Sequence, residues 1–183
     1  MSDTTYRHRS SDSFWVFGYG SLMWNPGFDF VDVYPALLRG YHRAFCVYSV
    51  VYRGTPACPG LVLGLDHGGS CLGKVYRVAT EKVAEVTAYL NSREMVTSVY
   101  QPKVLPVCVG GRIVPAHTYV VDRRHSQYAR NITTGRVVEI IRRGVGCAGD
   151  NRSYLRDTVH HLDMLGLGDG PLHRLLDWVE RDP

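Results

Sequence analysis

The order of its apolar patterns is what most constrains the fold of this chain. Runs of β-forming residues occupy most of the sequence up to Val121, with one segment of helical spacing among them, and the remaining third is helical in pattern. Strands that alternated with helices would have predicted parallel βαβ units. The grouped order instead predicts an α+β fold, in which helices pack against a small, mostly antiparallel, barrel-like sheet.

Six segments are expected to form strands, because they are rich in aromatic and β-branched residues and end at glycine or polar turns. The third and fourth segments flank His67-Gly68-Gly69, a sequence typical of a hairpin turn. Pro115 in the last segment predicts a strand at a sheet edge, since proline has no N–H group to donate. The six segments are residues 14–19, 41–51, 60–66, 70–78, 100–109 and 112–121.

Four segments are expected to form helices. The first, residues 80–94, begins at Thr80, which can cap a helix, and carries Val83, Val86 and Leu90 at helical spacing. Glycine-rich turns separate the other three, and glycine commonly ends a helix. These three are residues 136–143, 152–165 and 171–180.

Length and composition predict one ordered domain with a short tail. The first 13 residues are mostly polar and cannot bury enough apolar surface to offset the entropy lost on ordering. We therefore expect a flexible tail there and a single domain over residues 14–183, which is long enough for one substantial core. The net charge of +4 is too small to indicate a nucleic-acid partner and is compatible with a small anionic substrate.

Hydropathy and cysteine usage indicate a cytoplasmic protein. The N-terminus lacks a hydrophobic signal sequence, and no apolar run approaches the ~18 residues of a membrane span, so no membrane partner is expected. The five cysteines are an odd number without a C-x-x-C pair, which favours reduced thiols over a disulfide framework or a zinc ribbon. The sequence leaves the oligomeric state open.

No motif indicates a metal or another cofactor. Gly144, Gly146 and Gly149 match the spacing of a dinucleotide-binding loop. That motif requires a second parallel strand further on, whereas glycine-rich sequence and a helix follow here, so we interpret the segment as a turn between helices. The eight histidines contain no metal-binding pattern, and the adjacent His160 and His161 would point ~100° apart on a helix.

Glu94 is the carboxylate most clearly directed toward the interior. At ~100° per residue, Val86, Leu90 and Glu94 fall on one face of the first helix. Glu85 falls on the opposite face, and Arg93 is too far round the helix to be an obvious partner of Glu94. A carboxylate turned inward loses hydration of its charged form, which raises its pKa and suits a general acid and base. The geometric alternative is a glutamate in a salt bridge at a helix end.

The turn after the first strand is the second candidate region. Residues 17–22, with the sequence FGYGSL, place two glycines and a serine directly after an apolar run. Glycine lets a ligand approach the backbone closely, and free N–H groups can bind a carboxylate or a developing oxyanion. The pattern also fits an ordinary turn, and no serine-hydrolase motif surrounds Ser21.

Five separated motifs are more specific than any of these patterns alone. They are WVFGYGSLMWNP at 15–26, RGYHRAFCVYS at 39–49, RGTPACPGLVLGLDHGGSCLGKVYRV at 53–78, YLNSRE at 89–94 and GCAGDNRSYL at 146–155. Together they resemble the ChaC-like, glutathione-specific γ-glutamylcyclotransferases, and the resemblance runs from about Trp15 to the last helix. The family implies the same α+β fold.

The resemblance implies an intramolecular reaction of glutathione. The α-amino group of the γ-glutamyl residue attacks its own γ-carbonyl carbon, and 5-oxoproline and cysteinylglycine are released. By position, Glu94 would take the ammonium proton and later protonate the leaving nitrogen. Because nucleophile and electrophile belong to one substrate, no nucleophilic side chain, metal or cofactor is required. The residues expected to bind the γ-glutamyl group are Val16, Phe17, Gly18, Tyr19, Gly20, Ser21 and Tyr128.

The substrate-contacting tyrosine and the substrate range stay open. The sequence after Glu94 lacks the glycine-tyrosine pair found close to the catalytic glutamate in many members of the family. Either Tyr100 or Tyr128 could supply a hydroxyl group, and we favour Tyr128. Alternative functions are the cyclisation of other γ-glutamyl amines or peptides, and a non-catalytic regulator that binds an anion at the glycine turn.

Overall fold

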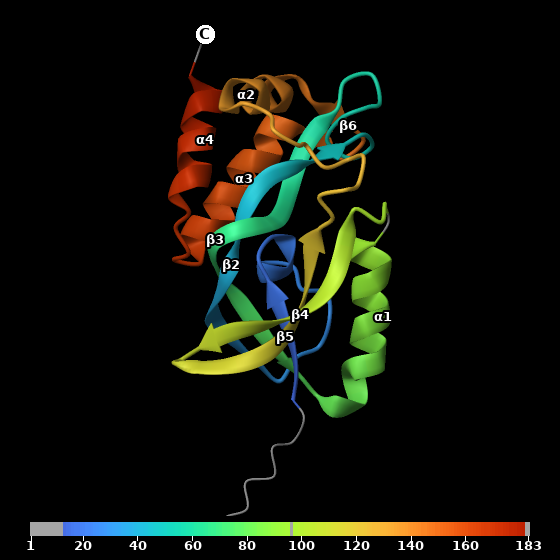
Figure 1. Cartoon of the computed structure of the whole chain (residues 1–183), viewed down its shortest axis with the longest axis vertical. Helices are drawn as coiled ribbons and strands as arrows, with labels where there is room; N and C mark the ends of the chain where they lie inside the picture. The colour runs from blue at the N-terminus through green and yellow to red at the C-terminus, as the bar shows by residue number, and fades with distance from the viewer. Residues whose placement is uncertain (1–12, 96, 182–183) are drawn as a thin grey trace, which may run out of the picture.

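Five strands close into a barrel on which the other elements pack (Figure 1). The structure, a computed structural model, describes residues 13–95 and 97–181. The strand order is β1-β3-β2-β4-β5, and the closing pair of β1 and β5 is parallel whereas the other neighbours are antiparallel. The strands are β1 (Phe14–Gly18), β2 (Asp32–Ser49), β3 (Gly60–Val78), β4 (Tyr100–Val109) and β5 (Arg112–Val121). The predicted fold class is confirmed.

β5 closes the barrel, so the prediction that Pro115 marks a sheet edge is wrong. On one side Pro115 lies opposite Pro106 of β4. On the other side β1 pairs with β5 only at Ala116 and His117. Pro115 therefore lies just outside the β1 ladder, where its missing N–H group interrupts no pairing with that strand.

β2 and β3 form one long antiparallel ribbon, so the predicted hairpin turn at His67-Gly68-Gly69 is also wrong. β3 continues through this site, and Gly40 of β2 lies opposite both Gly68 and Gly69 in a bulge. The three glycines have φ values of 83°, 103° and 67°, which side chains of L-residues rarely adopt. The bulge separates the half of the ribbon in the barrel from the half that extends toward the helices (Figure 1).

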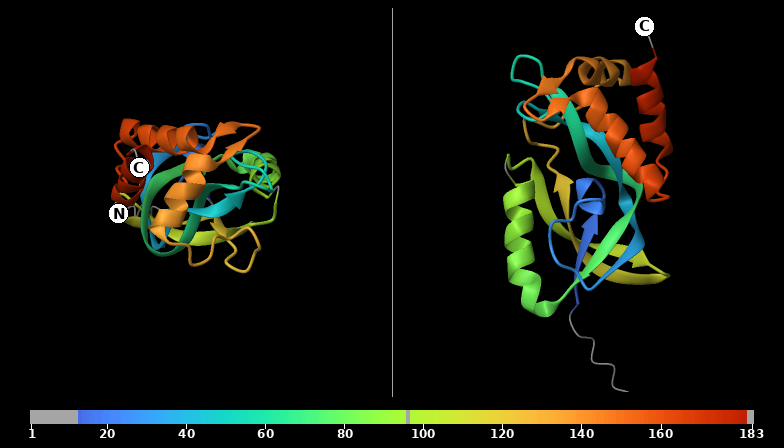
Figure 2. Two further views of the ribbon diagram at one scale, coloured as in Figure 1. Left: turned by 90° about the horizontal axis from the view of Figure 1, so that it is seen from above. Right: turned by 180° about the vertical axis from the view of Figure 1, so that it is seen from behind.

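In the described part of the chain, four α-helices cover this framework, close to the predicted positions. α1 (Val83–Glu94) lies along the side of the barrel, and the other three gather at the extended end of the ribbon (Figures 1 and 2). A 3-10 turn at Thr80–Lys82 leads into α1, and neither element has a side-chain cap. The tail predicted over residues 1–13 lies, apart from Ser13, outside the described residues. The other helices are α2 (Thr134–Arg143), α3 (Asn151–Met164) and α4 (Gly170–Glu180).

The glycine-rich segment between α2 and α3 is a site of close backbone packing. It forms two short paired strands, β6 (Val145–Gly146) and β7 (Gly149–Asp150), where the sequence predicts a bare turn. A Cβ atom on Gly146 would lie 2.5 Å from backbone atoms of Val51 and Tyr52. The absence of a side chain at this position therefore lets the loop between β2 and β3 pack against β6.

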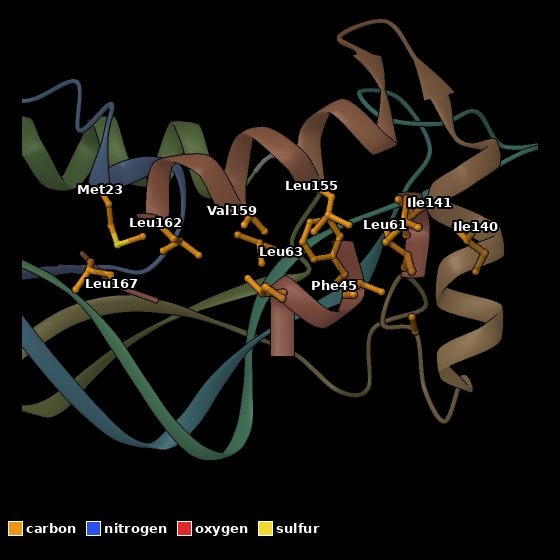
Figure 3. Packing of buried hydrophobic residues seen from close by; sticks show 14 residues of the cluster. Met23, Phe45, Leu61, Leu63, Ile140, Ile141, Leu155, Val159, Leu162 and Leu167 are labelled. Atoms are coloured by element: carbon orange, nitrogen blue, oxygen red, sulfur yellow. The ribbon is translucent and has the colours of Figure 1, made fainter. Parts of the chain in front are cut away.

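The helices α2–α4 pack on the extended half of the ribbon through one apolar cluster (Figure 3). Phe45 of β2 and Leu61 and Leu63 of β3 lie among buried side chains of these helices. Met23, from the loop after β1, belongs to the same cluster. Asn151 joins α3 to β3, because its Nδ2 donates to Leu61 O at 2.7 Å and its Oδ1 accepts from Leu61 N–H at 2.6 Å.

This last contact predicts a stability effect. Asn151→Leu is expected to lower the free energy of unfolding by about 2–6 kcal/mol, because two buried backbone groups lose their partners. Urea unfolding monitored by circular dichroism measures the change. Arg152→Ala, at the exposed neighbouring position, is the control, and equal stabilities of the two variants would contradict the assignment.

Candidate active site

A cavity of about 190 Å³ brings the two candidate regions together. β1 ends at Gly18, and the chain then turns into the short 3-10 helix η1 (Ser21–Met23). This loop contributes one part of the cavity wall, and Glu94, the last residue of α1, contributes another. Of the predicted site residues, the lining contains Phe17, Tyr19, Gly20, Ser21 and Glu94.

Val16 and Gly18 lie behind this lining. Val16 is fully buried and packs with Leu22 and Tyr76 in the apolar cluster beneath α1. A Cβ atom on Gly18 would lie 3.0 Å from Leu22 Cβ, so the glycine allows η1 to fold closely onto the end of β1. The two residues thus support the loop instead of facing the cavity.

Several buried or half-buried tyrosines complete the wall. Tyr100 of β4, Tyr119 of β5 and Tyr154 of α3 join Tyr19 there. The Tyr100 hydroxyl donates to Leu63 O at 2.6 Å. Burial raises the pKa of Tyr119 to about 12 and the pKa values of Tyr19 and Tyr100 well above the ordinary value. The phenols therefore stay neutral at physiological pH and keep a proton that they can donate.

Tyr128 lies away from this cavity. Its hydroxyl donates to Asp66 Oδ2 at 2.9 Å, and Arg123 Nε donates to the other oxygen of the same carboxylate at 2.6 Å. These bonds hold the segment after β5 against β3. Of the two tyrosines considered for the substrate contact, the structure places Tyr100 in the same wall as Glu94.

Glu94 is partly buried at the end of α1. Val86 and Leu90, on the same face of the helix, are 2% and 1% exposed, and the Glu94 side chain is 19% exposed. Arg93 Nε lies 3.3 Å from Glu94 Oε1, so the expectation that Arg93 is badly placed to pair with Glu94 is wrong. The reason is that Met95 has already left helical geometry, and helical spacing no longer fixes side-chain directions at this end.

The electrostatic surroundings of Glu94 suit proton transfer. Burial raises the pKa of its carboxyl group, and the positive charge of Arg93 partly offsets that shift. The phenols of Tyr19 and Tyr100 are close enough for the Glu94 charge to raise their pKa values as well. A carboxyl group whose pKa is moved toward neutrality can both accept and return a proton near neutral pH.

Arg93 also ties the loop after β1 to α1. Its Nη2 donates to Ser21 Oγ at 2.8 Å, and its Nη1 donates to Asn25 O and to Tyr89 Oη, each at 2.8 Å. One guanidinium group thus contacts the catalytic candidate, its own helix and both ends of the loop segment 21–25. The sequence offered no signal for this set of contacts, because the partners are about 70 residues apart.

A second cavity, of about 200 Å³, adjoins the first. Glu94 and Tyr100 belong to the walls of both. The rest of its wall is mostly apolar, with Ser49 and Gln127 among its polar side chains. A ligand that extends through both cavities would therefore pass the Glu94 carboxyl group.

Three further features bear on metal binding, membrane insertion and the state of the thiols. Within residues 13–95 and 97–181, no group of three His, Cys, Asp or Glu side chains is arranged to hold a metal ion. Every helix in that part of the chain is too short or too polar to cross a bilayer. All five cysteines are free thiols in the structure.

The family model of ChaC-like proteins matches residues 14–182. The chain belongs to this family. A glutathione-specific gamma-glutamylcyclotransferase of Escherichia coli (strain K12) is 36% identical to it over 168 residues, which cover 91% of this chain and 73% of that protein. A glutathione-specific gamma-glutamylcyclotransferase of Schizosaccharomyces pombe (strain 972 / ATCC 24843) is 32% identical over an alignment of 183 residues that covers 88% of each chain.

A solved structure has the same fold. The crystal structure of a yeast gamma-glutamyl cyclotransferase specific to glutathione superposes with a TM-score of 0.81. The two chains are 24% identical, and the superposition covers 92% of this chain and 96% of the yeast chain. The likeness confirms that the barrel with its packed helices is a γ-glutamylcyclotransferase fold.

The raised pKa of Glu94 predicts a pH-dependent effect on stability. An acid whose pKa is higher in the folded than in the unfolded state costs stability as the pH rises through the folded value, since the folded state must then bury a charge. Glu94→Gln is therefore expected to raise the free energy of unfolding at pH 7.5. At pH 4, below the ordinary value of 4.5, the effect should be small.

Urea unfolding at the two pH values measures this difference. Glu85→Gln, on the exposed face of the same helix, is the matched control. A Glu94→Gln variant that is less stable than the wild type at pH 7.5 would show that burial does not dominate the pKa of Glu94.

Proposed function

We propose that this protein is a glutathione-specific γ-glutamylcyclotransferase, a lyase that releases 5-oxoproline and cysteinylglycine from glutathione. The observation that carries the proposal is a partly buried carboxyl group, Glu94, at the boundary of two adjoining cavities and across from a glycine-rich loop. Membership of the ChaC-like family and the activities named for the relatives support the same reaction.

The γ-glutamyl group of the substrate binds in the first cavity. Ligand-binding pockets usually measure ~300 Å³ or more. Neither cavity reaches this volume, whereas the two together exceed it, which favours a ligand with two parts. The backbone N–H groups at Gly20 and Ser21 precede the first hydrogen-bonded turn of η1, so they are available to the glutamyl carboxylate or to the γ-carbonyl oxygen.

Glu94 transfers the proton from the α-ammonium group to the leaving nitrogen. Its carboxylate takes a proton from the α-ammonium group, and the free amine attacks the γ-carbonyl carbon to close a five-membered ring. The C–N bond to cysteine then breaks as Glu94 returns this proton to the leaving nitrogen. The ring nitrogen, positively charged after the attack, gives up a second proton, which Glu94 passes to the released amine, so that 5-oxoproline holds a neutral amide and cysteinylglycine leaves as an ammonium ion. A raised pKa suits this residue, because it must hold the proton during the step between acceptance and return.

Hydrogen-bond donors stabilise the tetrahedral intermediate. Negative charge develops on the γ-carbonyl oxygen as the ring closes, and donors fixed beforehand are the most effective at stabilising such charge. The loop N–H groups are the fixed donors in this cavity wall, and the neutral hydroxyl of Tyr100 lies in the same wall. The Tyr100 hydroxyl has one proton and donates it to Leu63 O at 2.6 Å, so it must turn from that carbonyl group to donate to the substrate.

Cysteinylglycine leaves through the second cavity. The mostly apolar wall of that cavity accommodates the cysteine side chain, and the polar groups of Ser49 and Gln127 are available to the peptide and the terminal carboxylate. This arrangement accounts for a preference for a peptide as leaving group over a small amine. Free thiols at all five cysteines agree with a reducing, cytoplasmic setting, which is part of the proposal.

Removal of the proton carrier is the decisive test. Glu94→Gln keeps the size of the side chain and is expected to lower kcat for 5-oxoproline release from glutathione at least ~100-fold, the usual contribution of general acid and base catalysis. Chromatographic detection of 5-oxoproline measures the rate. Glu85→Gln is again the matched control, and full activity of Glu94→Gln would exclude Glu94 as the proton carrier.

A pair of tyrosine variants tests which hydroxyl contacts the substrate. Tyr100→Phe removes a hydroxyl group from the wall beside Glu94 and is expected to lower kcat/KM by ~10-fold or more. Tyr128→Phe removes one partner of Asp66 and should lower the thermal midpoint while changing kcat/KM less than Tyr100→Phe does. The reverse order of the two effects on kcat/KM would favour Tyr128.

A substrate panel separates the alternatives. The wild type is expected to release 5-oxoproline faster from glutathione than from γ-glutamyl amines, because only a peptide leaving group fills the second cavity. Faster cyclisation of a γ-glutamyl amine would make that class the substrate. Binding of 5-oxoproline without any turnover would favour the non-catalytic regulator.

A further inference from the structure

Arg43 is a buried cation that the proposed chemistry does not use. It lies on the extended half of β2 and is 4% exposed. Its Nε donates to Tyr19 O, one Nη group donates to Leu72 O, and Nη1 forms an ion pair of 3.0 Å with Asp169 Oδ2. A single side chain therefore joins the loop after β1, the strand β3 and the start of α4.

Stability alone does not account for a charged pair at this position. The side chains of Arg43 and Asp169 are 2% and 14% exposed, so both charges have lost most of their hydration. Replacement of such a pair by well-packed apolar residues is often neutral or stabilising in proteins. What an apolar side chain could not provide here is a set of donors aimed at two backbone carbonyl groups.

One of these carbonyl groups, Tyr19 O, lies directly beside the candidate active site. Tyr19 O belongs to the peptide group that leads into Gly20, and both residues line the first cavity. The same guanidinium approaches Met23 Sδ at 3.8 Å. Arg43 of β2 thus contacts the loop at residues 19 and 23, whereas Arg93 of α1 contacts it at Ser21 and Asn25.

We propose that Arg43, held by Asp169, is a positioning residue that fixes residues 19–23 against Glu94 and so determines how efficiently the bound substrate cyclises. The inference rests on the function proposed above. Arg43 does not touch the substrate, because it is buried and belongs to the wall of neither the first nor the second cavity.

The contact with Tyr19 O has an electronic consequence as well as a geometric one. A cationic donor on a carbonyl oxygen polarises the peptide group, and hydrogen bonds in series strengthen one another. The N–H group of that peptide is the N–H of Gly20, which lies in the cavity wall. Arg43 therefore makes this N–H a better donor to the oxygen on which negative charge develops.

The ion pair also connects the site to the layer of helices. Asp169 is the N-cap of α4, where its Oδ1 accepts from Leu172 N–H at 3.3 Å while Oδ2 faces Arg43. Met23 packs in the same apolar cluster as Leu162 and Leu167, and Figure 3 shows these three side chains together. The helix layer therefore positions the loop in two ways, through the ion pair of Asp169 with Arg43 and through the packing of Met23 against Leu162 of α3.

Asp169→Asn is the variant that separates these roles. Asparagine is as good an N-cap as aspartate, so α4 keeps its start, but the carboxylate that holds Arg43 is lost. We expect kcat/KM for glutathione to fall about 10- to 100-fold, as is typical when reacting groups are misplaced by ~1 Å. The acidic limb of the pH profile should stay in place, because Arg93 still pairs with Glu94 and still holds the loop at Ser21 and Asn25.

Arg43→Lys provides a second, independent variant. Lysine keeps the positive charge beside Asp169 but cannot reach the two carbonyl groups at once, so it should show the same loss of kcat/KM. The double variant should be no worse than the more damaged single variant, since both changes break one chain of contacts. Additive losses would mean that Asp169 and Arg43 act separately.

Asp163→Asn is the matched control. Asp163 pairs with His173 of α4, its side chain is 53% exposed, and it belongs to the wall of neither cavity, so activity should be retained. Lower thermal midpoints of Asp169→Asn and Arg43→Lys with wild-type kcat/KM would overturn the positioning role and leave a structural one. Absence of 5-oxoproline release by the wild type would instead refute the proposed function, which keeps the two failures distinct.

Discussion

The contacts of Arg93 are the ones on which the candidate site depends. The glycine loop follows β1, the first strand, whereas Glu94 ends a helix about 70 residues later, and Arg93 is the side chain that bonds to both. Burial is what raises the pKa of the Glu94 carboxyl group, and this burial requires the loop to stay closed beside α1. The same arginine limits the shift through its charge, so closure and proton affinity are set by one residue.

The closed barrel fixes the position of the glycine loop relative to the end of α1. β1 is paired on both sides, with β3 and with β5, so the end of the strand has little freedom to move. α1 is fixed to the same wall by Val86 and Leu90, which pack with Val16 and Tyr76. The candidate acid and the loop are therefore both attached to β1, which is a short and stiff connection between them.

Sequence periodicity predicted most of the fold but could not distinguish a turn from a bulge. The bounds of β4 and β5 agree with the predicted segments, because Gly110 and Gly111 mark their connection locally. Gly68 and Gly69 carry an equally strong local signal, yet they lie in a bulge opposite Gly40, a partner nearly 30 residues away. A glycine indicates a position where the backbone can take a positive φ. Whether that position is a hairpin turn or a bulge within a strand depends on how the strands pair.

The difference between local patterns and long-range contacts also explains which site residues could be predicted. Glu94 and the glycine loop were found because each carries a local pattern, an inward helical face in one case and a glycine turn after a strand in the other. The choice between Tyr100 and Tyr128 depends on which strand face turns toward which cavity, and the contacts of Arg93 and Arg43 depend on partners far along the chain.

An enzyme for an intramolecular cyclisation needs no nucleophile of its own, so its task is to hold one conformation of the substrate beside one proton carrier. The chain contributes to that task mostly through residues that touch other parts of the protein. Arg93 holds the loop from α1, Arg43 holds it from β2, and Met23 packs it onto the helices. These contacts thus fix a segment of seven residues, 19–25, from three sides. The geometry of the candidate site therefore depends on these supporting contacts. Of the helices α2–α4, only α3 contributes a residue to the wall of the first cavity, Tyr154, and yet these helices help to position the loop.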